Sequence, residues 1–499
     1  MEAKKPENLV NHINIKYLAK YYPWAKFNFI VKIFSPCGLT NLHNLENEIK
    51  NSLTLKTQEL KFMLKFMLRF RGGIHPRERK EATENKPIEV APLPSRVYLP
   101  LSQHLGAPSR AVVKKGDRVF TGSVIGEPGG AVSVPTHSSI SGTVADVVDL
   151  PHPLTGRLTT TVIIESDGND TMVTTIQEQH TADLTPQQII DAVRNAGIVG
   201  LGGAAFPTFF KLMSPKDKPV DTLIINGCEC EPYLTADHRL MLEKPAEIVE
   251  GVSFLARALS VQNVIIAIED NKQNAIEAIQ ENVAGKNFRV VKLKTKYPQG
   301  AEKQLIKACL NREVPSGGLP ADVGCIVQNV GTSLAVRNAA RFNRPLYERV
   351  VTITGPGVKE PKNLWVRVGT PVRDLIEFCG GYNGQPRKII NGGPMMGIAL
   401  SSDQAPVLKG TSGILVFNQA EEPSEQDCIR CARCIQVCPM GLSPTRLNYH
   451  IRAKRFTAAK NEHLLDCIEC GCCSYVCPAK IRLVHNFKFG KAEIARLKV

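Results

Sequence analysis

The sequence lacks the features of a membrane-spanning or secreted chain. No run of about 18 apolar residues, the length that crosses a bilayer as a helix, occurs in its 499 residues. A charged n-region, an apolar h-region and a small-residue cleavage site do not follow one another at the start, so we predict no secretory signal. Aromatic residues are also scarce, at 6%. The 43% of hydrophobic and 22% of charged residues still fit a soluble globular protein and exclude a wholly disordered or collagen-like chain.

Acidic residues are in short supply, because 47 Asp and Glu stand against 62 Lys and Arg, a net charge of +15. Such an excess can indicate nucleic-acid binding. Here, however, residues 1–80 carry 15 basic and 6 acidic residues and residues 420–499 carry 13 and 8, while the middle is nearly neutral, with 34 and 33. The positive charge belongs to two ends of a neutral body, and we predict no nucleic-acid partner.

The N-terminal region shows little pattern. Residues 1–62 are rich in Lys and Asn, and we predict a flexible extension or upstream sequence read from an early start codon, with Met63 or Met67 as the functional start. In LKFMLKFMLRF (60–70), basic residues recur every four positions and so share one helical face. Two interpretations stay open: a basic amphipathic helix on an anionic membrane surface, or a short helix packed on its own protein.

The rest of the chain reads as a multidomain α/β protein. Residues 63–170 combine the amphipathic start with short β-rich runs that resemble the barrel-sandwich fold of biotinyl and lipoyl carrier domains. Their modified lysine would lie in the turn VPTHSSIS (134–141), which has no lysine, so we predict a scaffold. Residues 175–345 alternate apolar strands with amphipathic helices, which predicts a doubly wound parallel sheet. Residues 346–415 return to β character, and 420–490 form a last domain.

Nine of the 15 cysteines lie within residues 428–477. Without an export signal, they indicate metal binding rather than disulfides. Two runs follow C-x2-C-x2-C-x3-C-P, in which the fourth cysteine ligates the other cluster of a two-cluster ferredoxin. We therefore predict two [4Fe–4S] clusters in a ferredoxin-like α domain, one held by Cys428, Cys431, Cys434 and Cys477 and the other by Cys467, Cys470, Cys473 and Cys438. Zinc sites use paired knuckles with a long gap and fit this pattern poorly.

Three other cysteines, Cys309, Cys325 and Cys379, are isolated and are predicted to lie in the core. Cys472 falls between predicted ligands and is predicted not to be one.

A cofactor site is indicated in the α/β region. The loop 200–205 matches G-x-G-x-x-[GA], but a helix at 186–196 precedes it, which excludes an ordinary dinucleotide-binding turn. Polar clusters follow the predicted strands at 226–232, 269–272, 296–300 and 328–332. Strand-to-helix loops are often polar because they cap helices. Several at one sheet edge, beside a glycine-rich loop, favour a ligand site.

These motifs carry a family resemblance. GLGGAAFPTFFK (200–211), INGCECEPY (225–233), KYPQGAEKQL (296–305) and QNVGT (328–332) resemble the flavin-binding motifs of the NADH-oxidising subunit of respiratory complex I. With FRGGIHP (70–76) and the two cysteine runs, the order of domains resembles the C subunit of the Rnf (Rsx) ion-translocating electron-transport complex over about residues 63–490. Residues 350–400 resemble the soluble-ligand-binding β-grasp domain of the same family.

The resemblance implies FMN, NAD(H) as substrate, and a peripheral position on the cytoplasmic face of the inner membrane. It also implies partner subunits that include a ferredoxin-like iron–sulfur subunit. The residues carried over to flavin and nicotinamide binding are Gly200, Gly202, Gly203, Phe206, Lys211, Asn226, Glu229, Glu231, Tyr297, Gly300, Gln328, Asn329 and Thr332. Of these, Lys211 would approach the flavin phosphate, and Glu229 and Glu231 would line the isoalloxazine and nicotinamide side.

The sequence departs from the family pattern at two places. Ala205 replaces a usual glycine, which adds strain if this position needs a positive φ. Cys228 and Cys230 stand where complex I carries Asp and Ser.

The implied function is hydride exchange between NAD(H) and FMN, followed by single-electron transfer through the clusters to a partner, coupled to ion translocation. No side chain is predicted to act as an acid or base. The alternatives are a soluble NADH-dependent reductase of the cobalamin-reductase type and a non-catalytic electron-wire subunit.

Overall fold

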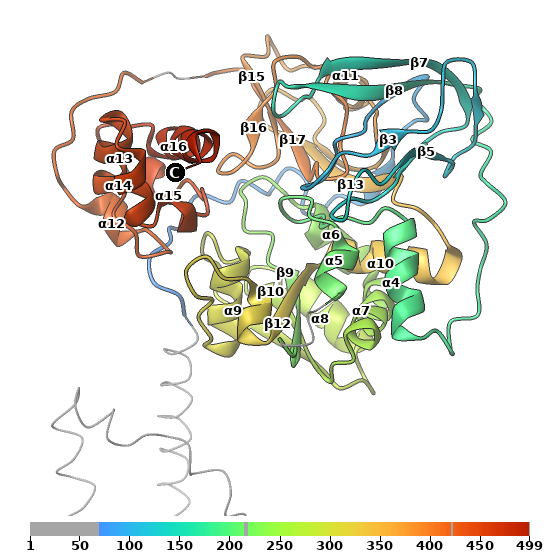
Figure 1. Ribbon diagram of the computed structural model, residues 1–499, viewed down its shortest axis with the longest axis horizontal. Coiled ribbons are helices and arrows are strands. Elements are labelled where there is room, and N and C mark those ends of the chain that lie inside the picture. Colours follow the sequence, from blue (N-terminus) through green and yellow to red (C-terminus); the bar gives the residue numbers. More distant parts are fainter. Residues whose placement is uncertain (1–68, 214–217, 421–422, 499) are drawn as a thin grey trace, which may run out of the picture. The chain divides into compact units, whose positions relative to one another are not determined.

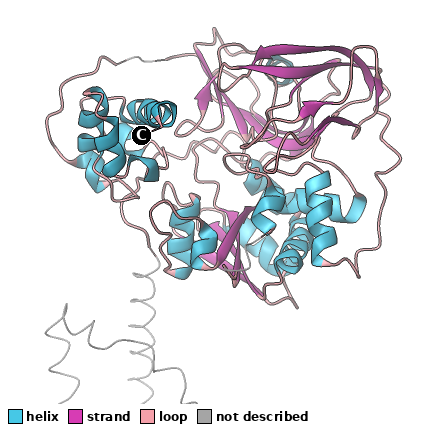
Figure 2. Ribbon diagram, viewed as in Figure 1, coloured by secondary structure: helices cyan, strands magenta, loops and turns pink. Residues whose placement is uncertain are grey.

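The computed structural model describes residues 69–213, 218–420 and 423–498. All of these residues belong to one compact unit, Met67–Val499. The predicted extension 1–62 and nearly all of the predicted basic helix lie outside them. In the described part, β-rich, mixed and helical regions follow one another (Figures 1 and 2). The prediction of a multidomain α/β protein is confirmed at this level.

The first β-rich region forms two small antiparallel sheets. One has the order β2 (Arg96–Pro100), β8 (Leu158–Ser166), β7 (Gly142–Pro151) and β4 (Arg118–Val119). The other has the order β3 (Arg110–Ala111), β5 (Val124–Glu127) and β6 (Thr136–His137). Side chains of both, including Val97, Ile125 and Ile164, share one core, as expected for facing sheets with alternating apolar residues.

The turn that would carry a prosthetic group in a carrier domain is buried. All residues from 133 to 142 are buried, and the Ser139 hydroxyl donates a hydrogen bond to the carbonyl oxygen of Val368 at 2.5 Å. A turn enclosed by other parts of the chain cannot swing with an attached group. The structure therefore agrees with the prediction of a scaffold.

A four-stranded parallel sheet with the order β11 (Phe288–Leu293), β10 (Asn263–Glu269), β9 (Thr222–Gly227) and β12 (Cys325–Asn329) forms the centre of the mixed region. The helices around it are α4 (Pro186–Asn195), α5 (Thr208–Leu212), α6 (Ala236–Glu243), α7 (Pro245–Leu259), α8 (Gln273–Asn282), α9 (Glu302–Leu310) and α10 (Val330–Phe342), with a 3-10 turn, η2 (Pro320–Val323). Strands and helices alternate along the chain as predicted.

Both faces of this sheet are covered. Ile225 and Ile266 belong to one core with residues of α7, α8 and α10, whereas Ile224 and Ile265 belong to another with residues of α9 (Figure 1). Successive strand residues point to opposite faces, so a sheet packed on both sides needs continuous apolar strands. This is why TLIIN and NVIIAI lack the alternation of a one-sided sheet.

The third region is a mixed six-stranded sheet with the order β1 (Ile88–Val90), β14 (Lys362–Arg367), β13 (Glu348–Thr354), β17 (Gly413–Phe417), β15 (Lys388–Asn391) and β16 (Ile398–Ala399). Helix α11 (Val372–Phe378) packs into its core. Strand β1 corrects the sequence prediction, which placed it with the other strands of residues 63–170 in the first β-rich domain. It instead pairs in parallel with β14, a long-range contact that no local pattern specifies.

Residues 423–498 contain helices and loops only (Figure 2). The elements are α12 (Arg433–Gln436), α13 (Pro444–Arg452), α14 (Phe456–Asn461), η3 (Leu464–Asp466), α15 (Cys472–Tyr475) and α16 (Leu483–Leu497). Leu447, Phe487 and Ile494 belong to their common core. No helix in the described ranges combines the length and the apolar character of a membrane span.

Lys409 joins three of these regions. Its buried ammonium donates hydrogen bonds to the carbonyl oxygens of Gly197 at 2.8 Å and Pro135 at 3.1 Å, and its backbone N–H donates to the Gln103 side chain at 3.0 Å. Burial lowers the pKa of Lys409 to about 7, and that of the neighbouring His137 to about 3. His137 therefore stays neutral where Lys409 titrates.

We expect a Lys409→Met variant to reveal this titration. Above pH 7 the folded lysine releases its proton while the unfolded one keeps it up to about pH 10.4, so the free energy of unfolding rises with pH in the wild type by at most about 1.4 kcal/mol per unit. Urea unfolding of both chains between pH 7 and 9 should therefore show a difference, wild type minus variant, that grows with pH. A difference that stays constant over this range would contradict the assignment.

Candidate functional site

The glycine-rich loop 200–206 lies against the first turn of α10. The Leu201 N–H donates a hydrogen bond to the Thr332 hydroxyl at 3.0 Å. A Cβ on Gly202 would stand 2.7 Å from Asn329 Nδ2, so only glycine fits there, whereas a Cβ on Gly203 would meet no atom within 4 Å. One side of the loop is thus packed against the helix, and the other is open to a ligand.

Polar side chains organise the start of α10. The Asn329 side chain caps the helix by accepting hydrogen bonds from the N–H groups of Gly331 and Thr332. Its amide nitrogen donates to Asp237 Oδ2 at 2.6 Å, and burial raises the pKa of Asp237 to about 7. Gln328, one residue earlier, is buried with no partner for its Nε2. The positive end of the helix and a spare donor together suit an anionic or carbonyl-rich ligand.

Unpartnered buried atoms concentrate in the predicted flavin motifs. Besides Gln328, the Thr208 hydroxyl in the glycine-rich motif and Gln299 Nε2 in the KYPQG motif are buried without a hydrogen-bond partner. Each such group costs about 1–3 kcal/mol when it stays unsatisfied. A ligand rich in carbonyl, hydroxyl and phosphate oxygens, as FMN is, would satisfy them, so the residues present fit this cofactor.

Two of the predicted residues lie in helix α5 or just before it. Lys211 forms an ion pair with Glu302 at 2.7 Å, and its Nζ lies 3.4 Å from the carbonyl oxygen of Val327, in the middle of β12. The half-buried Phe206, just before the helix, packs edge-on against Phe210 with ring centroids 5.7 Å apart. The structure therefore places Lys211 beside β12, next to the residue that precedes Gln328.

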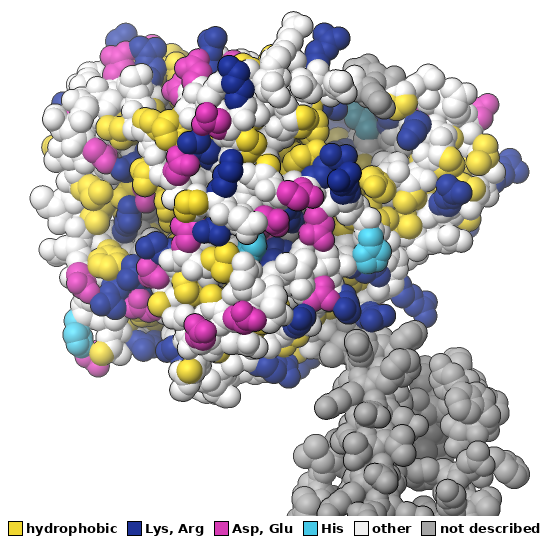
Figure 3. All heavy atoms as spheres, turned by 180° about the vertical axis from the view of Figure 1, so that it is seen from behind, with side chains coloured by type: hydrophobic (Ala, Val, Ile, Leu, Met, Phe, Trp, Pro, Cys, Tyr) yellow, Lys and Arg dark blue, Asp and Glu magenta, His cyan; other side chains and the backbone are white. Residues whose placement is uncertain are grey.

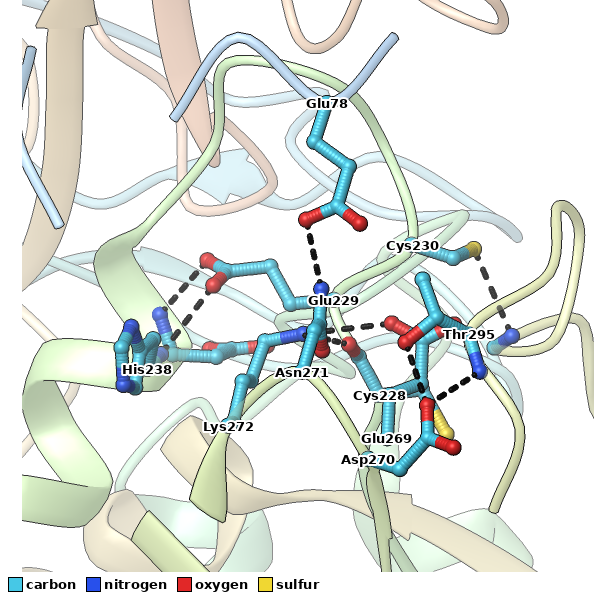
Figure 4. Close-up of polar contacts among 12 residues, drawn as sticks. Glu78, Cys228, Glu229, Cys230, His238, Glu269, Asp270, Asn271, Lys272 and Thr295 are labelled. Atoms are coloured by element: carbon cyan, nitrogen blue, oxygen red, sulfur yellow. Dashed lines mark hydrogen bonds and ion pairs between the residues drawn. The ribbon is translucent and has the colours of Figure 1, made fainter. Parts of the chain in front are cut away.

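Three predicted residues, at the end of β9 and in the loop after it, form hydrogen bonds with backbone groups. Asn226 donates to the carbonyl oxygen of Gly300 at 2.8 Å and accepts from the Cys228 N–H at 3.1 Å. The Glu229 carboxylate accepts from two N–H groups at the start of α6, at 2.8 and 3.1 Å (Figure 4). The Glu231 carboxylate accepts from the N–H groups of Met395 and Met396 at 3.0 and 2.9 Å. In this structure both carboxylates fix loops.

Two buried lysines, neither of them among the predicted site residues, also hold this loop. Lys272 donates to the carbonyl oxygen of Cys228 at 2.7 Å and pairs with Glu269 at 3.1 Å (Figure 4). Burial opposes its charge, yet Glu269 raises the pKa of Lys272 overall. Lys80 donates to the carbonyl oxygens of Glu229 and Leu234, and burial lowers its pKa. The polar run at 269–272 was a signal for Lys272, but Lys80 had none.

The KYPQG segment connects this site to the helical region. Tyr297 is 2% exposed, and its hydroxyl donates to the carbonyl oxygen of Cys470 at 2.7 Å. Gly300 packs on the loop after β9, where its N–H donates to Cys230 Sγ at 3.4 Å. Tyr297 and Gly300 therefore lie beside Asn226 and Cys230, as one site requires.

The two cysteine runs have the same backbone form. Positive φ occurs two residues after the first cysteine, at Arg430 and Glu469, and directly after the second, at Ala432 and Gly471. Alternation of left- and right-handed residues points successive N–H groups into one concavity, a geometry common at iron–sulfur sites. In the second run the Glu469 N–H donates to Cys467 Sγ at 3.4 Å.

The structure brings the four cysteines of one predicted set around a single cavity. The cavity is lined by one complete predicted ligand set, together with mainly apolar residues such as Leu447 and Phe487. That set is Cys438, Cys467, Cys470 and Cys473, the fourth cysteine of one run with the first three of the other. Within the described residues no group of His, Cys, Asp or Glu converges closely enough for a single metal ion. The donor set and the cavity fit a multi-iron cluster.

The other predicted set lies closer to the surface. Cys428 and Cys431 are exposed, Cys477 is half-buried and Cys434 is buried. All described cysteines are free of disulfides, and Cys309, Cys325 and Cys379 are buried in the core as predicted.

Comparison with known proteins agrees with this arrangement. Four family models match in order: the RnfC barrel sandwich hybrid domain over 68–169, the Nuo51 FMN-binding domain over 193–338, the SLBB domain over 350–399 and the 4Fe-4S dicluster domain over 422–478. The C subunit of the proton-translocating ferredoxin:NAD(+) oxidoreductase complex of Clostridium ljungdahlii is 50% identical over 85% of this chain and 93% of its own. Its counterpart in the Na(+)-translocating complex of Acetobacterium woodii is 46% identical over 85% and 97%.

The chain belongs to the RnfC family. A third relative, the C subunit of the ion-translocating oxidoreductase complex of Rhodobacter capsulatus, is 44% identical over 85% of this chain and 83% of its own. A solved NAD+-reducing [NiFe]-hydrogenase aligns with 57% of this chain and 56% of its own at 20% identity, and its TM-score of 0.44 is too low to support an argument.

Ala205 stands where the family pattern has a glycine, and its backbone is left-handed. Its φ is +53°, so the condition for strain in the sequence prediction is met. The Leu105 N–H, from the first β-rich region, lies 3.4 Å from the Ala205 carbonyl oxygen, and a Cβ on Gly410 would lie 3.3 Å from that of Ala205. Neighbouring regions hold the strained residue in place.

We expect Ala205→Val to lower the stability of the loop by about 1–2 kcal/mol, because a β-branched residue is a genuine outlier at positive φ. Thermal unfolding should occur at a lower temperature, and the purified chain should retain less flavin, as measured by fluorescence. Ala205→Gly is the control. Relief of strain is offset there by the entropy of glycine, so its stability should change by less than about 1 kcal/mol. Equal behaviour of the two variants would argue against strain at this position.

Proposed function

We propose that this chain is the peripheral redox subunit of a membrane complex that couples electron transfer between NAD(H) and ferredoxin-type carriers to ion translocation. Relatives of up to 50% identity, named as the C subunits of such complexes, carry the proposal. The FMN-binding and 4Fe-4S family models and the fitting residues support it. On this view the chain is part of an enzyme, an ion-translocating oxidoreductase.

Bound FMN would exchange a hydride with NAD(H) and single electrons with two [4Fe–4S] clusters, which bridges two-electron and one-electron chemistry. The chain's own residues bind and orient. The open side of Gly200, Gly202 and Gly203 admits the close approach of a flat ring. The start of α10, with Gln328 and Lys211, offers donors to the ribityl and phosphate oxygens.

Glu229 and Glu231 act in this proposal by shaping the ring pocket, since their carboxylates fix α6 and the loop 393–396. Phe206, Asn226, Tyr297 and Gly300 complete the site around the ring, and Asn329 and Thr332 shape its phosphate end. No described side chain is assigned an acid or base role.

The two cysteine sets have different surroundings. The set of Cys438, Cys467, Cys470 and Cys473 adjoins Tyr297 of the flavin site through Cys470. The set of Cys428, Cys431, Cys434 and Cys477 presents exposed thiols. We infer that the first set is proximal to the flavin and that electrons enter or leave the chain at the second.

The domain boundaries and finer fold names remain part of the proposal: 63–170 as a barrel-sandwich, 175–345 as a doubly wound FMN domain, 346–415 as a β-grasp domain and 420–490 as a ferredoxin-like domain. Their order follows that of the four family models. We also propose that the chain lies on the cytoplasmic face of the inner membrane, bound to partner subunits and the membrane surface. Its net charge supports contact with anionic surfaces.

The surface at the exposed cysteines suits an acidic iron–sulfur partner. Ile429 and Ile435 are 69% and 40% exposed, and Arg430 and Arg433 beside them are also exposed. In Figure 3, where the cluster region lies at the right, hydrophobic and basic side chains outnumber acidic ones on it. An apolar centre with a basic rim steers an acidic carrier toward the surface.

Anaerobic purification tests the function directly. We expect about one FMN and about eight irons per chain, two clusters of four, and bleaching of the flavin by NADH. Cys467→Ala should lose about half of the iron, one cluster of the two, whereas the matched control Cys472→Ala, a buried cysteine in the same cavity, should keep it all. Zinc in place of iron would refute the clusters. Eight irons without flavin or NADH:ferricyanide activity would instead support an electron-wire subunit.

Charge reversal tests the partner surface. Arg430→Glu combined with Arg433→Glu should slow electron transfer from the reduced chain to an acidic ferredoxin by about tenfold at low salt and remove its salt dependence. Glu is tolerated at position 430, because Glu469 has the same backbone form in the second run. The control reverses two exposed residues outside this region, Arg387 and Lys388. Equal rates in the two variants would exclude the surface.

A further inference from the structure

Tyr297 occupies the contact between the flavin motifs and the cluster-binding loop. It comes from the segment between β11 and α9, yet its hydroxyl donates to the carbonyl oxygen of Cys470 at 2.7 Å. The nearest carboxylate oxygen, Glu231 Oε1, is farther away at 3.4 Å. The stronger hydrogen bond of the buried phenol therefore goes to the peptide of a predicted cluster ligand and not to the adjacent acid.

The backbone of Tyr297 reaches a second ligand of the same set. Its N–H and carbonyl pair with the carbonyl and N–H of Ile74 at 2.9 and 2.8 Å. The preceding Gly73 donates to the carbonyl oxygen of Val437 at 2.8 Å, and a Cβ on Gly72 would stand only 2.6 Å from the carbonyl oxygen of Cys438. Segment 72–74 is thus clamped between Tyr297 and Cys438.

Further contacts fix the same loop from the other side. The Glu231 carboxylate holds Met395 by its N–H at 3.0 Å, and a Cβ on Gly471 would lie 3.0 Å from the Met395 carbonyl oxygen. Cys472, 0% exposed, points its thiol toward the Tyr297 carbonyl oxygen at 4.0 Å. The tyrosine is therefore enclosed by the loop that it contacts.

We propose that Tyr297 is a positioning residue whose hydroxyl, distinct from its ring, holds the Cys470 peptide in register with the flavin site and so sets the rate of electron transfer between the two sites. This inference rests on the proposed function. The tyrosine keeps its proton and its electrons throughout: the one electron lost at the flavin is gained by the cluster, and only the hydrogen bond is contributed by Tyr297.

The electrostatics of the phenol agree with a donor role. The hydroxyl donates to a carbonyl oxygen, which can only accept, so the hydroxyl hydrogen lies between the two oxygens. Its O–H dipole points its positive end at the Cys470 carbonyl. Negative charge that arrives on the neighbouring cluster would be stabilised by this dipole, which predicts a lower reduction potential once the hydroxyl is removed.

Tyr297→Phe separates the hydroxyl from the ring. In the anaerobic holoprotein mixed with NADH in a stopped-flow instrument, flavin reduction should stay within about twofold of wild type. Cluster reduction should slow by about fivefold, equivalent to about 1 kcal/mol, the usual contribution of one hydrogen bond. Dithionite titration followed by electron paramagnetic resonance should show a lowered potential and an altered signal for one cluster only.

Tyr347→Phe is the matched control. Tyr347 is also fully buried, and its hydroxyl accepts a hydrogen bond from Arg344 Nε at 2.7 Å, away from the cysteine runs. Its cluster potentials and rates should equal those of the wild type.

Two results would overturn the inference: wild-type rates and potentials in Tyr297→Phe, or a loss of iron from that variant, which would indicate a purely structural role. The dithionite titration needs neither flavin nor NADH. A wild-type chain without NADH activity would therefore refute the proposed function while the test of Tyr297 still gives its answer.

Discussion

Buried cations that donate to backbone carbonyl oxygens hold this molecule together around its candidate site. Lys409 joins Gly197 to Pro135, and Arg349 joins the carbonyl oxygens of Lys409 and Leu201. Lys80 and Lys272 do the same for the loop after β9. A buried charge is tolerated only when its hydrogen bonds are satisfied, so each cation requires its loops to take one conformation. The irregular segments around the site depend on this constraint.

Two half-buried carboxylates complement the cations by accepting hydrogen bonds from backbone N–H groups. Glu229 accepts from the first N–H groups of α6, and Glu231 accepts from those of Met395 and Met396. Loops at the ends of parallel strands have no ladder of their own, and their polar groups need partners from elsewhere. Charged side chains supply these partners here, which leaves glycines, amides and the start of α10 to face a ligand. Because these groups are already held in place, they need no rearrangement when a reaction takes place.

The cysteine-rich region is built from a repeated unit. Two runs with left-handed residues at equivalent positions each form a concavity, and Cys438, the fourth cysteine of the first run, lines a cavity with the first three predicted ligands of the second. One concavity is enclosed against Tyr297 and segment 72–74, while the other presents Cys428 and Cys431 at the surface. The asymmetry comes from packing, since the two runs share one cysteine spacing. As a result, one predicted cluster site is enclosed and the other lies at the surface.

Local patterns were enough to predict the cysteine runs and the alternation of apolar strands with amphipathic helices in residues 175–345, because spacing and hydrophobic period are short-range properties. The strain at Ala205 also followed from one residue type at one motif position. Tertiary structure alone decided that β1 joins β14, that the Glu229 carboxylate caps α6, and that the Tyr297 hydroxyl reaches Cys470. These contacts join residues far apart in the chain, and their geometry depends on how separately folded regions dock, which no local sequence signal specifies.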